Sequence, residues 1–484
     1  MVERIWLASV HSPDASKRVR GVVSARTLFL PLVDVFGDEE TIELFSDHAL
    51  VEAWLEVERA LALAQSELGI LPGAAAAAIA AEATGDKVDL GHLREQTRVV
   101  GYPILPLLEQ IKAASSPDVA RYLHWGATTQ DVMDTGLAIT LARALDRVET
   151  LERALGDAIA SRAEEHRTTV MAGRTHGQHA VPITFGGKLA VWLAELERHL
   201  QRLRSARARA AVVQLFGAAG TGAALGPEIR ELRRRLAAQL SLGVVDVPWH
   251  TARDGLAEVG FVLAAVAATC GKIGREVIEL SRPEIGELKE AGGHHRGASS
   301  TMPQKANPIG SETVVGLSVL AAQQVPALLA AMQAGHERSA GEWQVEWDAI
   351  PGIAAAAAGA LAGAAGVIGG LQVFPERMRA NLELEGGLIM AEAVMMAAAP
   401  LVGRGQAHDL VYEACATARR EGLVLAEAIR RELDPELVAT LPPLETLLDP
   451  AQYLGETDAI VTTALEGWTR ATTLAPPEAG TAQR

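Results

Sequence analysis

The chain has 484 residues and a formal net charge of −16, with 49% hydrophobic and only 4% aromatic residues. This length can bury a large core and hold several domains. The acidic balance and the absence of a long basic run argue against nucleic-acid binding through phosphates, and two cysteines are too few for a disulfide framework, so we predict a cytoplasmic protein without a nucleic-acid partner.

Residues 1–123 are predicted to form an N-terminal helical domain after an irregular start. The first 21 residues contain no continuous apolar segment followed by a cleavage site, so no secretory signal is expected. Alanine, leucine, arginine and glutamate dominate the chain, and these residues lose little rotamer freedom in a helix. The composition therefore favours helix from the outset.

Residues 124–372 are predicted to form a central domain of long helices. Between Lys188 and Ala210 the apolar side chains recur every three or four positions, which is typical of one buried helical face. They are Leu189, Trp192, Leu193, Leu196, Leu200 and Leu203. The segment Glu258–Ser281 is apolar on most faces, so it should lie inside a bundle, with Cys270 as a buried free thiol.

Residues 349–375 carry no charge, and their length alone would fit a membrane span. Alanine and glycine contribute little transfer free energy, however, and Pro351 interrupts the start, so we favour a buried helix and no membrane partner. Residues 373–484 are predicted to form a C-terminal helical domain with a disordered tail. Because no run of alternating strands is evident, the predicted fold is all-α with three helical domains.

Three polar segments interrupt this helical pattern, and the first is "HWGATTQDVMDT", His124 to Thr135. Thr128 followed by Asp131 is typical of a capping box at a helix start. The free N–H groups and the hydroxyls of Thr128 and Thr129 could bind a carboxylate there. A well-capped helix without any ligand is the alternative that this segment leaves open.

The second segment is "GRTHGQHAVPITFG", Gly173 to Gly186. His176 and His179 are three residues apart, but a zinc site needs three or four ligands, and only His294 and His295 could be added. We therefore predict no metal, and favour an acid–base or hydrogen-bonding role for histidine here over a histidine satisfied within the fold.

The third segment is "GASSTMPQKANPIGSE", Gly297 to Glu312. A serine hydroxyl becomes a useful base only if cations and backbone N–H groups stabilise its alkoxide, and Lys305 and Asn307 follow the serine pair closely. The glycines around the segment permit the motion of a lid that excludes water. A surface loop is the alternative.

Two other enzyme classes find no support. "GAAGTGAALG", Gly217 to Gly226, does not match the dinucleotide-binding GxGxxG pattern and follows a helical segment rather than a strand. The GxSxG nucleophile elbow is absent. We predict that the protein uses no cofactor.

Together the three segments resemble the motifs of the fumarase/aspartase superfamily. "ASSTMPQKAN", Ala298 to Asn307, matches the family loop GSSxMPxKxN except that Ala298 replaces its first glycine. His124 to Thr135 resembles the HxGxTSxDxxDT segment of the adenylosuccinate lyase and 3-carboxy-cis,cis-muconate cycloisomerase branch, and Gly173 to Gly186 resembles the third shared segment. The resemblance covers about residues 30–460.

This resemblance implies anti β-elimination, or its reverse, on succinate-like substrates through an aci-carboxylate intermediate. It places the base at Ser299, the acid at His176 and the glutamate paired with that acid at Glu312. Around a small dicarboxylate or tricarboxylate it places the binding residues Thr128, Thr129, His124, Thr175, Gln178, Ser300, Met302, Lys305, Asn307 and Arg338. It also implies a homotetramer around a central bundle of long helices, in which three subunits share each active site.

Within the family the sequence points in two directions. The segment "VVGYPILPLLEQI", Val99 to Ile111, resembles the corresponding segment of the cycloisomerase. His176, in contrast, resembles the acid of the fumarate-releasing lyases. We predict a C–N lyase that eliminates a nitrogen-linked group from an N-substituted aspartate or nitrosuccinate and releases fumarate. The alternative is the lactonising cycloisomerase, and a more remote one is a non-catalytic scaffold of the same fold.

Overall fold

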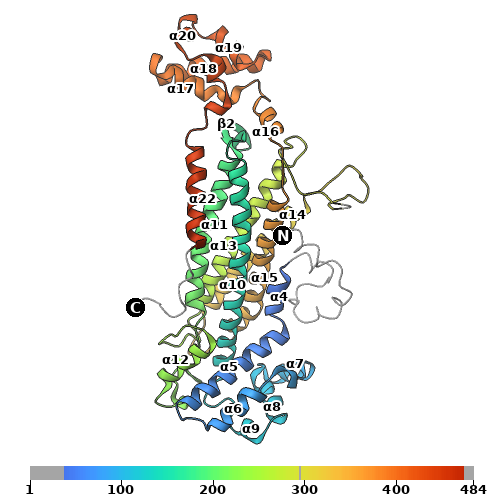
Figure 1. Cartoon of the computed structure of the whole chain (residues 1–484), viewed down its shortest axis with the longest axis vertical. Coiled ribbons are helices and arrows are strands. Elements are labelled where there is room, and N and C mark those ends of the chain that lie inside the picture. Colours follow the sequence, from blue (N-terminus) through green and yellow to red (C-terminus); the bar gives the residue numbers. More distant parts are fainter. Residues whose placement is uncertain (1–36, 294–295, 474–484) are drawn as a thin grey trace.

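The all-α prediction is confirmed by the computed structural model, which describes residues 37–293 and 296–473. The predictions for the irregular start, the tail, His294 and His295 lie outside these residues. Long helices run side by side as a shaft, with one lobe of short helices at each end (Figure 1). The shaft helices are α10 (Thr129–Glu165), α11 (Phe185–Ala210), α13 (Asp254–Leu280), α14 (Ile309–Ala331), α15 (Glu342–Gly369) and α22 (Thr457–Thr473).

The two lobes differ in how far their elements are separated along the chain. The lower lobe combines helices from the first part of the chain with one later helix: α5 (Asp47–Glu67), α6 (Gly73–Glu82), α7 (Leu90–Val100), α8 (Ile104–Ala113), α9 (Pro117–Tyr122) and α12 (Ile229–Leu240). The short helix α4 (Glu39–Leu44) contacts α10 and α15. The upper lobe holds α16 (Pro375–Leu382), α17 (Ala391–Val402), α18 (Arg404–Glu421), α19 (Leu425–Glu432), α20 (Pro435–Thr440) and α21 (Leu444–Leu447). Although α22 comes last, it lies along α11 in the shaft.

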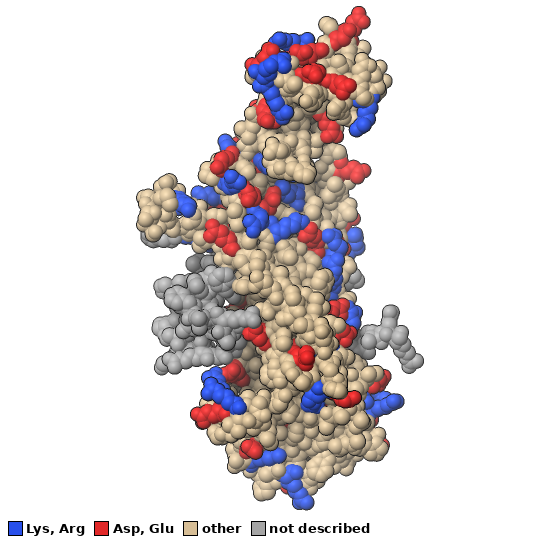
Figure 2. All heavy atoms as spheres, turned by 180° about the vertical axis from the view of Figure 1, so that it is seen from behind, with Lys and Arg blue, Asp and Glu red and all other residues tan. Residues whose placement is uncertain are grey.

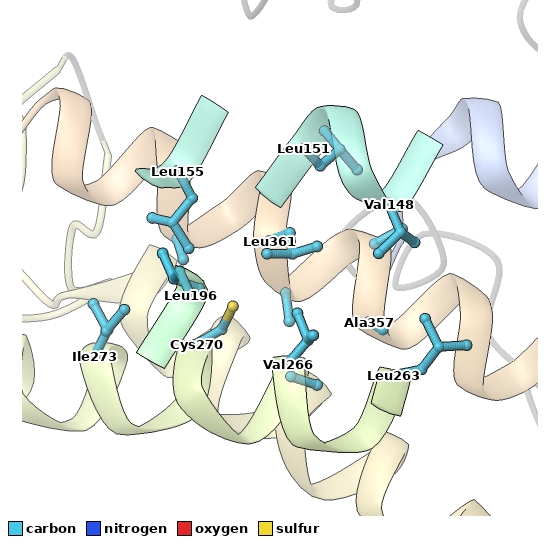
Figure 3. Close-up of a cluster of buried hydrophobic side chains, with 14 of the residues drawn as sticks. Val148, Leu151, Leu155, Leu196, Leu263, Val266, Cys270, Ile273, Ala357 and Leu361 are labelled. Carbon is cyan, nitrogen blue, oxygen red and sulfur yellow. The ribbon is translucent and has the colours of Figure 1, made fainter. Parts of the chain in front are cut away.

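Apolar stripes explain why the long helices associate. The six residues of the predicted α11 stripe, Leu189 to Leu203, are all buried, which confirms that interpretation. In Figure 3, Cys270 of α13 lies among Leu155, Leu196 and Leu361, side chains from three other helices. Cys270 is a buried free thiol, as predicted, and burial raises its pKa.

Three of the described helices, α13, α14 and α15, are long and apolar enough to cross a membrane by length and composition alone. In α13 and α15 the most apolar stretch is 72% and 61% buried within the chain, against 28% in α14. The predicted Ala/Gly-rich helix is α15, although it starts earlier and ends at Gly369. A Cβ atom on Gly359 would lie 2.8 Å from the Cα atom of Gly37, so small residues do permit close packing there.

Two short antiparallel pairs of strands are the exception to the all-helical pattern, and the sequence did not predict them. β1 (Val170–Thr175) pairs with β2 (Gln178–Thr184), and β3 (Leu288–Lys289) pairs with β4 (Gln372–Val373). The first pair directly follows α10 and forms a hairpin whose register shifts after Ala172. That irregularity breaks the alternation of buried and exposed residues by which a strand is recognised in a sequence.

A buried ion cluster joins three shaft helices at the end nearest the lower lobe. Arg253, which precedes α13, donates to Asp134 of α10 (Nη1 to Oδ2, 2.8 Å) and to Glu346 of α15 (Nε to Oε1, 2.8 Å). The three side chains are each about 1% exposed, and the Trp343 indole N–H also donates to Asp134. The cluster therefore fixes the starts of α10, α13 and α15 relative to one another.

Candidate active site

The first predicted site segment lies far from the second along the shaft. The first ends at the start of α10, while the second forms the hairpin that follows the end of α10. Because α10 has 37 residues and a helix rises 1.5 Å per residue, about 55 Å separates these two segments. A single chain therefore cannot bring His176 to Thr128 and Thr129.

At the start of α10, Asp131 organises the surrounding backbone. Its buried carboxylate accepts hydrogen bonds from the N–H groups of Thr128 (3.2 Å), Phe216 (3.0 Å) and Gly217 (2.9 Å) and from Nε2 of His250 (3.0 Å). Thr128 is the N-cap residue, as the capping box predicted, and Thr128 and Thr129 are half-buried. The N–H groups of the first turn of α10 thus lie beside the hydroxyls of Thr128 and Thr129, and such an arrangement can bind an anion.

His124 lies just before this helix start, and a buried carboxylate holds it. Its Nδ1 is 2.6 Å from Oε1 of Glu58 in α5. Burial alone would lower the pKa of His124, but the negative charge and hydrogen bond of Glu58 raise it overall. His124 also has a φ angle of 67°, which is unusual for a residue other than glycine and is often found at functional sites.

Arg338 belongs to the same end of the molecule. Its Nη2 donates to the carbonyl oxygen of Ala218 at 2.9 Å, and Ala218 follows Gly217, whose N–H binds Asp131. The structure thus brings Arg338 from a distant part of the chain to the region of His124, Thr128 and Thr129 around the start of α10.

The hairpin presents Thr175, His176 and Gln178 at its tip, and all three are exposed. Thr175 pairs with Gln178 across a two-residue turn, in which His176 has φ 53° and Gly177 has φ 73°. Positive φ at both central residues defines the tight turn that suits twisted strands. Next to the tip, Arg174 makes two hydrogen bonds to the buried carboxylate of Glu287, at 2.6 and 3.0 Å.

The loop of the third segment, Gly297 to Asn307, lies between β3 and α14. Ser299 Oγ accepts hydrogen bonds from the backbone N–H groups of Thr301 (3.3 Å) and Met302 (3.1 Å). Donors directed at this oxygen favour its alkoxide over its hydroxyl form, which is the property that a serine acid–base group needs. Ser300, Met302 and Lys305 are exposed on the same loop.

Backbone contacts close the base of this loop. The Asn307 N–H donates to the Gly297 carbonyl oxygen at 2.9 Å, Ala298 and Ala306 form a bridge, and Asn307 itself is half-buried. Glu290 then caps α14 by accepting from the N–H groups of Gly310 (3.2 Å) and Ser311 (2.7 Å). The loop is thus anchored at both ends while its serines and lysine stay accessible.

Glu312 is exposed in the first turn of α14. Within the described residues, neither Glu312 nor any other carboxylate forms a hydrogen bond with His176. The pairing that the family resemblance implied for these two residues is therefore not made inside one chain. Among residues 37–293 and 296–473, no group of three His, Cys, Asp or Glu side chains is arranged to hold a metal ion.

Glu58 is the site residue that the sequence interpretation missed. A signal for it exists, because Glu58 occupies a register position of the buried α5 stripe formed by Val51, Leu55, Ala62 and Gln65. A charged side chain in an apolar helical stripe indicates a buried partner. That the partner is His124, 66 residues away, could not be read from the pattern.

Gly297 provides a direct test of the loop geometry. It has φ 66°, and an added Cβ atom would lie 2.3 Å from the Asn307 carbonyl oxygen. We expect Gly297→Ala to displace the Ser299 segment and lower kcat/KM about 100-fold, since small misplacements of reacting groups are costly. Gly292→Ala, which meets open space in the same loop, is the matched control and should retain activity. Equal activities of the two variants in a steady-state assay would contradict this account.

Comparisons with known proteins agree with this arrangement. A lyase family model matches residues 38–323, and the model for the adenylosuccinate lyase C-terminus matches residues 387–464. The chain is 42% identical to 3-carboxy-cis,cis-muconate cycloisomerase from Pseudomonas aeruginosa over 425 residues, which covers 87% of this chain and 93% of that protein.

Two solved structures have the same fold over nearly their whole length. One is fumarate lyase from Mesorhizobium sp. BNC1, at 42% identity and a TM-score of 0.83 over 89% of this chain and 98% of that one. The other is 3-carboxy-cis,cis-muconate lactonizing enzyme from Pseudomonas putida, at 39% identity and a TM-score of 0.86 over 91% and 99%. Motifs, fold and relatives lead to one conclusion: the chain is an enzyme that belongs to the fumarase/aspartase superfamily.

Proposed function

We propose that the enzyme moves a proton at the carbon next to a carboxylate of a small polycarboxylate, with Ser299 as the proton-transferring group. The observation that carries this proposal is the pair of backbone N–H groups of Thr301 and Met302 directed at Ser299 Oγ. They stabilise the alkoxide of Ser299. This is the form that remains after the hydroxyl donates a proton, and it is also the form that can accept one.

The reaction that we assign is lactonisation of 3-carboxy-cis,cis-muconate. One carboxylate oxygen bonds to an alkene carbon while the neighbouring carbon receives one proton, so that no atom leaves and no electrons are exchanged with a second reactant. Support comes from the 42% identical cycloisomerase and the solved lactonizing enzyme. These relatives favour the cycloisomerase over the C–N lyase that the sequence had suggested first.

The remaining site residues would hold the carboxylates of such a substrate. Lys305 and Asn307 follow Ser299 in the loop, while Thr128, Thr129 and Arg338 lie around the start of α10. Thr175 and Gln178 flank the exposed turn of the hairpin, and Ser300 and Met302 complete the loop. The first turn of α10 adds N–H donors for a negative charge.

We also propose that the active protein is a homotetramer in which three subunits build each site. The 55 Å between the hairpin and the start of α10 requires more than one chain. The exposed apolar side chains of α14 support an assembly as well, because Val319, Leu320 and Leu329 are 46–53% exposed. Figure 2 shows extended areas of the shaft without charged side chains, while charges gather on the upper lobe. Large uncharged surfaces of this kind suit association.

Incubation with 3-carboxy-cis,cis-muconate tests the proposed reaction. We expect loss of the diene absorbance and a single lactone by NMR, and in D₂O the lactone should carry one deuterium at the carbon that was protonated. Persistence of the muconate, together with fumarate release from substituted succinates, would assign the enzyme to elimination instead.

Elimination is the second candidate because of one observation, the histidine at the exposed tip of the hairpin. A leaving group that departs as a base must be protonated by an acid, and a histidine can supply that proton. In addition, one solved structure at 42% identity is named a fumarate lyase. His176→Asn separates the two reactions. On 3-carboxymuconate we expect less than about a tenfold loss in kcat, because nothing departs, whereas amine release from an N-substituted aspartate should fall about 10²- to 10⁴-fold.

A further inference from the structure

The contact between His124 and Glu58 joins two groups that are both largely withdrawn from solvent. The His124 side chain is 20% exposed and that of Glu58 is 1% exposed, with 2.6 Å between Nδ1 and Oε1. Within the described residues, the second carboxylate oxygen of Glu58 is buried and has no hydrogen-bond partner. The imidazole ring is therefore the group that compensates this buried carboxylate, since an unpaired one would be costly.

The same contact fixes the direction of the ring. Nδ1 and Nε2 lie on opposite sides of an imidazole, so a ring anchored through Nδ1 on a buried oxygen keeps Nε2 on its open side. The backbone around His124 is fixed as well. Gln65 Nε2 donates to the Trp125 carbonyl oxygen at 2.8 Å, and a Cβ atom on Gly126 would lie 2.8 Å from the Ala224 carbonyl oxygen.

Three charged groups act on His124 from the helices packed around it: Glu58 from α5, Asp131 from α10 and Lys112 from α8. Asp131 already accepts hydrogen bonds from three backbone N–H groups and from His250. Lys112 opposes the imidazolium. The direct partner that favours a positive ring is therefore Glu58.

The open side of His124 belongs to a region that also carries other positive groups. Gly217 lies against the carbonyl oxygen of Gly126, and the next residue, Ala218, accepts the hydrogen bond of Arg338. The exposed N–H groups at the start of α10 complete the region. A charged imidazole here would meet a substrate carboxylate together with a guanidinium and a helix N-terminus.

We propose that Glu58 is a positioning residue that keeps His124 as an imidazolium, with Nε2–H presented to a carboxylate of a tricarboxylate substrate. This inference rests on the proposed function and assigns to His124 the binding of one substrate carboxylate. Glu58 touches no substrate and acts only through His124.

Binding of an unreactive probe, propane-1,2,3-tricarboxylate, tests this inference without turnover. Calorimetry at pH 7.5 in two buffers of different ionisation enthalpy measures the affinity and the number of protons taken up. On the proposal the His124 ring of the wild type is charged before the probe binds, so little proton uptake by it is expected. In Glu58→Gln the pKa of His124 falls, so we expect about 10- to 100-fold weaker binding and uptake of about one proton.

The sign of the pH dependence follows from the raised pKa of His124. Wild-type affinity should hold at neutral pH and fall only as the pH rises through that raised pKa. In Glu58→Gln the fall should begin at lower pH, so that the two affinities converge once the pH is low enough to charge both rings. A merely structural role for Glu58 would weaken binding at every pH alike, and that result would overturn the proposal.

Glu56→Gln is the matched control, since it makes the same change on the same helix. Glu56 forms a surface pair with Arg143 (2.8 Å) and should leave affinity and proton uptake unchanged. If Glu58→Gln fails to fold, the wild type and His124→Gln are compared instead. Uptake of about one proton by the wild type at pH 7.5 that is absent in His124→Gln would show that the free protein holds a neutral His124 ring. That result would overturn the proposal.

The two proposals can fail separately. Tricarboxylate binding that depends on Glu58, without turnover of 3-carboxymuconate, would retain the role of Glu58 and reject the assigned reaction. Turnover of 3-carboxymuconate by a Glu58→Gln variant with the wild-type KM, kcat and pH profile would retain the reaction and reject the role.

Discussion

Ser299→Ala is expected to lower kcat about 10²- to 10⁴-fold, the range for loss of a positioned proton-transferring group. The backbone N–H groups of Thr301 and Met302 that bind Ser299 Oγ remain in the variant, so only the transferring atom is lost. Because the side chain lies on an accessible loop, the unfolding midpoint should not change. Steady-state kinetics on 3-carboxymuconate and a thermal unfolding curve measure the two quantities.

Ser300→Ala is the companion variant, because it removes a hydroxyl from the neighbouring exposed position. It should lose less than about tenfold in kcat, since its hydroxyl is not the one that the backbone N–H groups bind. Near-normal turnover by Ser299→Ala, with a large loss in Ser300→Ala, would move the proton-transferring role to the second serine.

Arg253→Met is expected to lower the free energy of unfolding by about 3–5 kcal/mol, the cost of removing one partner from a buried ion pair. Arg253 compensates both Asp134 and Glu346, and all three side chains are about 1% exposed. Burial and the charge of Asp134 both raise the pKa of Glu346, which Arg253 counteracts. Without the guanidinium, two carboxylates would face each other among apolar side chains.

Urea unfolding at a fixed protein concentration measures this loss, because an oligomer unfolds in a concentration-dependent way. Arg234→Met is the control, since Arg234 is 62% exposed and pairs with Glu231 one turn away on the surface of α12. The control should leave the midpoint nearly unchanged. Similar midpoints for both variants would mean that the buried cluster does not stabilise the starts of α10, α13 and α15.

What the sequence could predict depended on how local the determining interactions are. The α11 stripe from Leu189 to Leu203 was readable because helical periodicity is set within a few residues. The capping of α10 by Thr128 and Asp131 was readable for the same reason. The hairpin was not, since it depends on His176 adopting a positive φ in a two-residue turn where asparagine or glycine is usual.

The candidate site was predictable as a set of residues but not as an arrangement. The motif positions pointed to Ser299 and the positions around it, and the structure adds two backbone N–H donors that bind Ser299 Oγ. The pairing of Glu58 with His124 spans 66 residues and two helical elements, so no short pattern encodes it. The preference for lactonisation over elimination came from the relatives, because the residue patterns pointed to both reactions.

The 55 Å that α10 places between two site segments has a genetic consequence on the proposed assembly. On that assembly, a chain with a damaged hairpin and a chain with a damaged start of α10 are each inactive alone, yet in a mixed tetramer some sites receive an intact hairpin from one parent and an intact helix start from the other. Two defective alleles of this gene could then restore part of the activity that neither possesses. On the proposed assembly, catalysis takes place where chains meet, whereas each allele encodes a single chain.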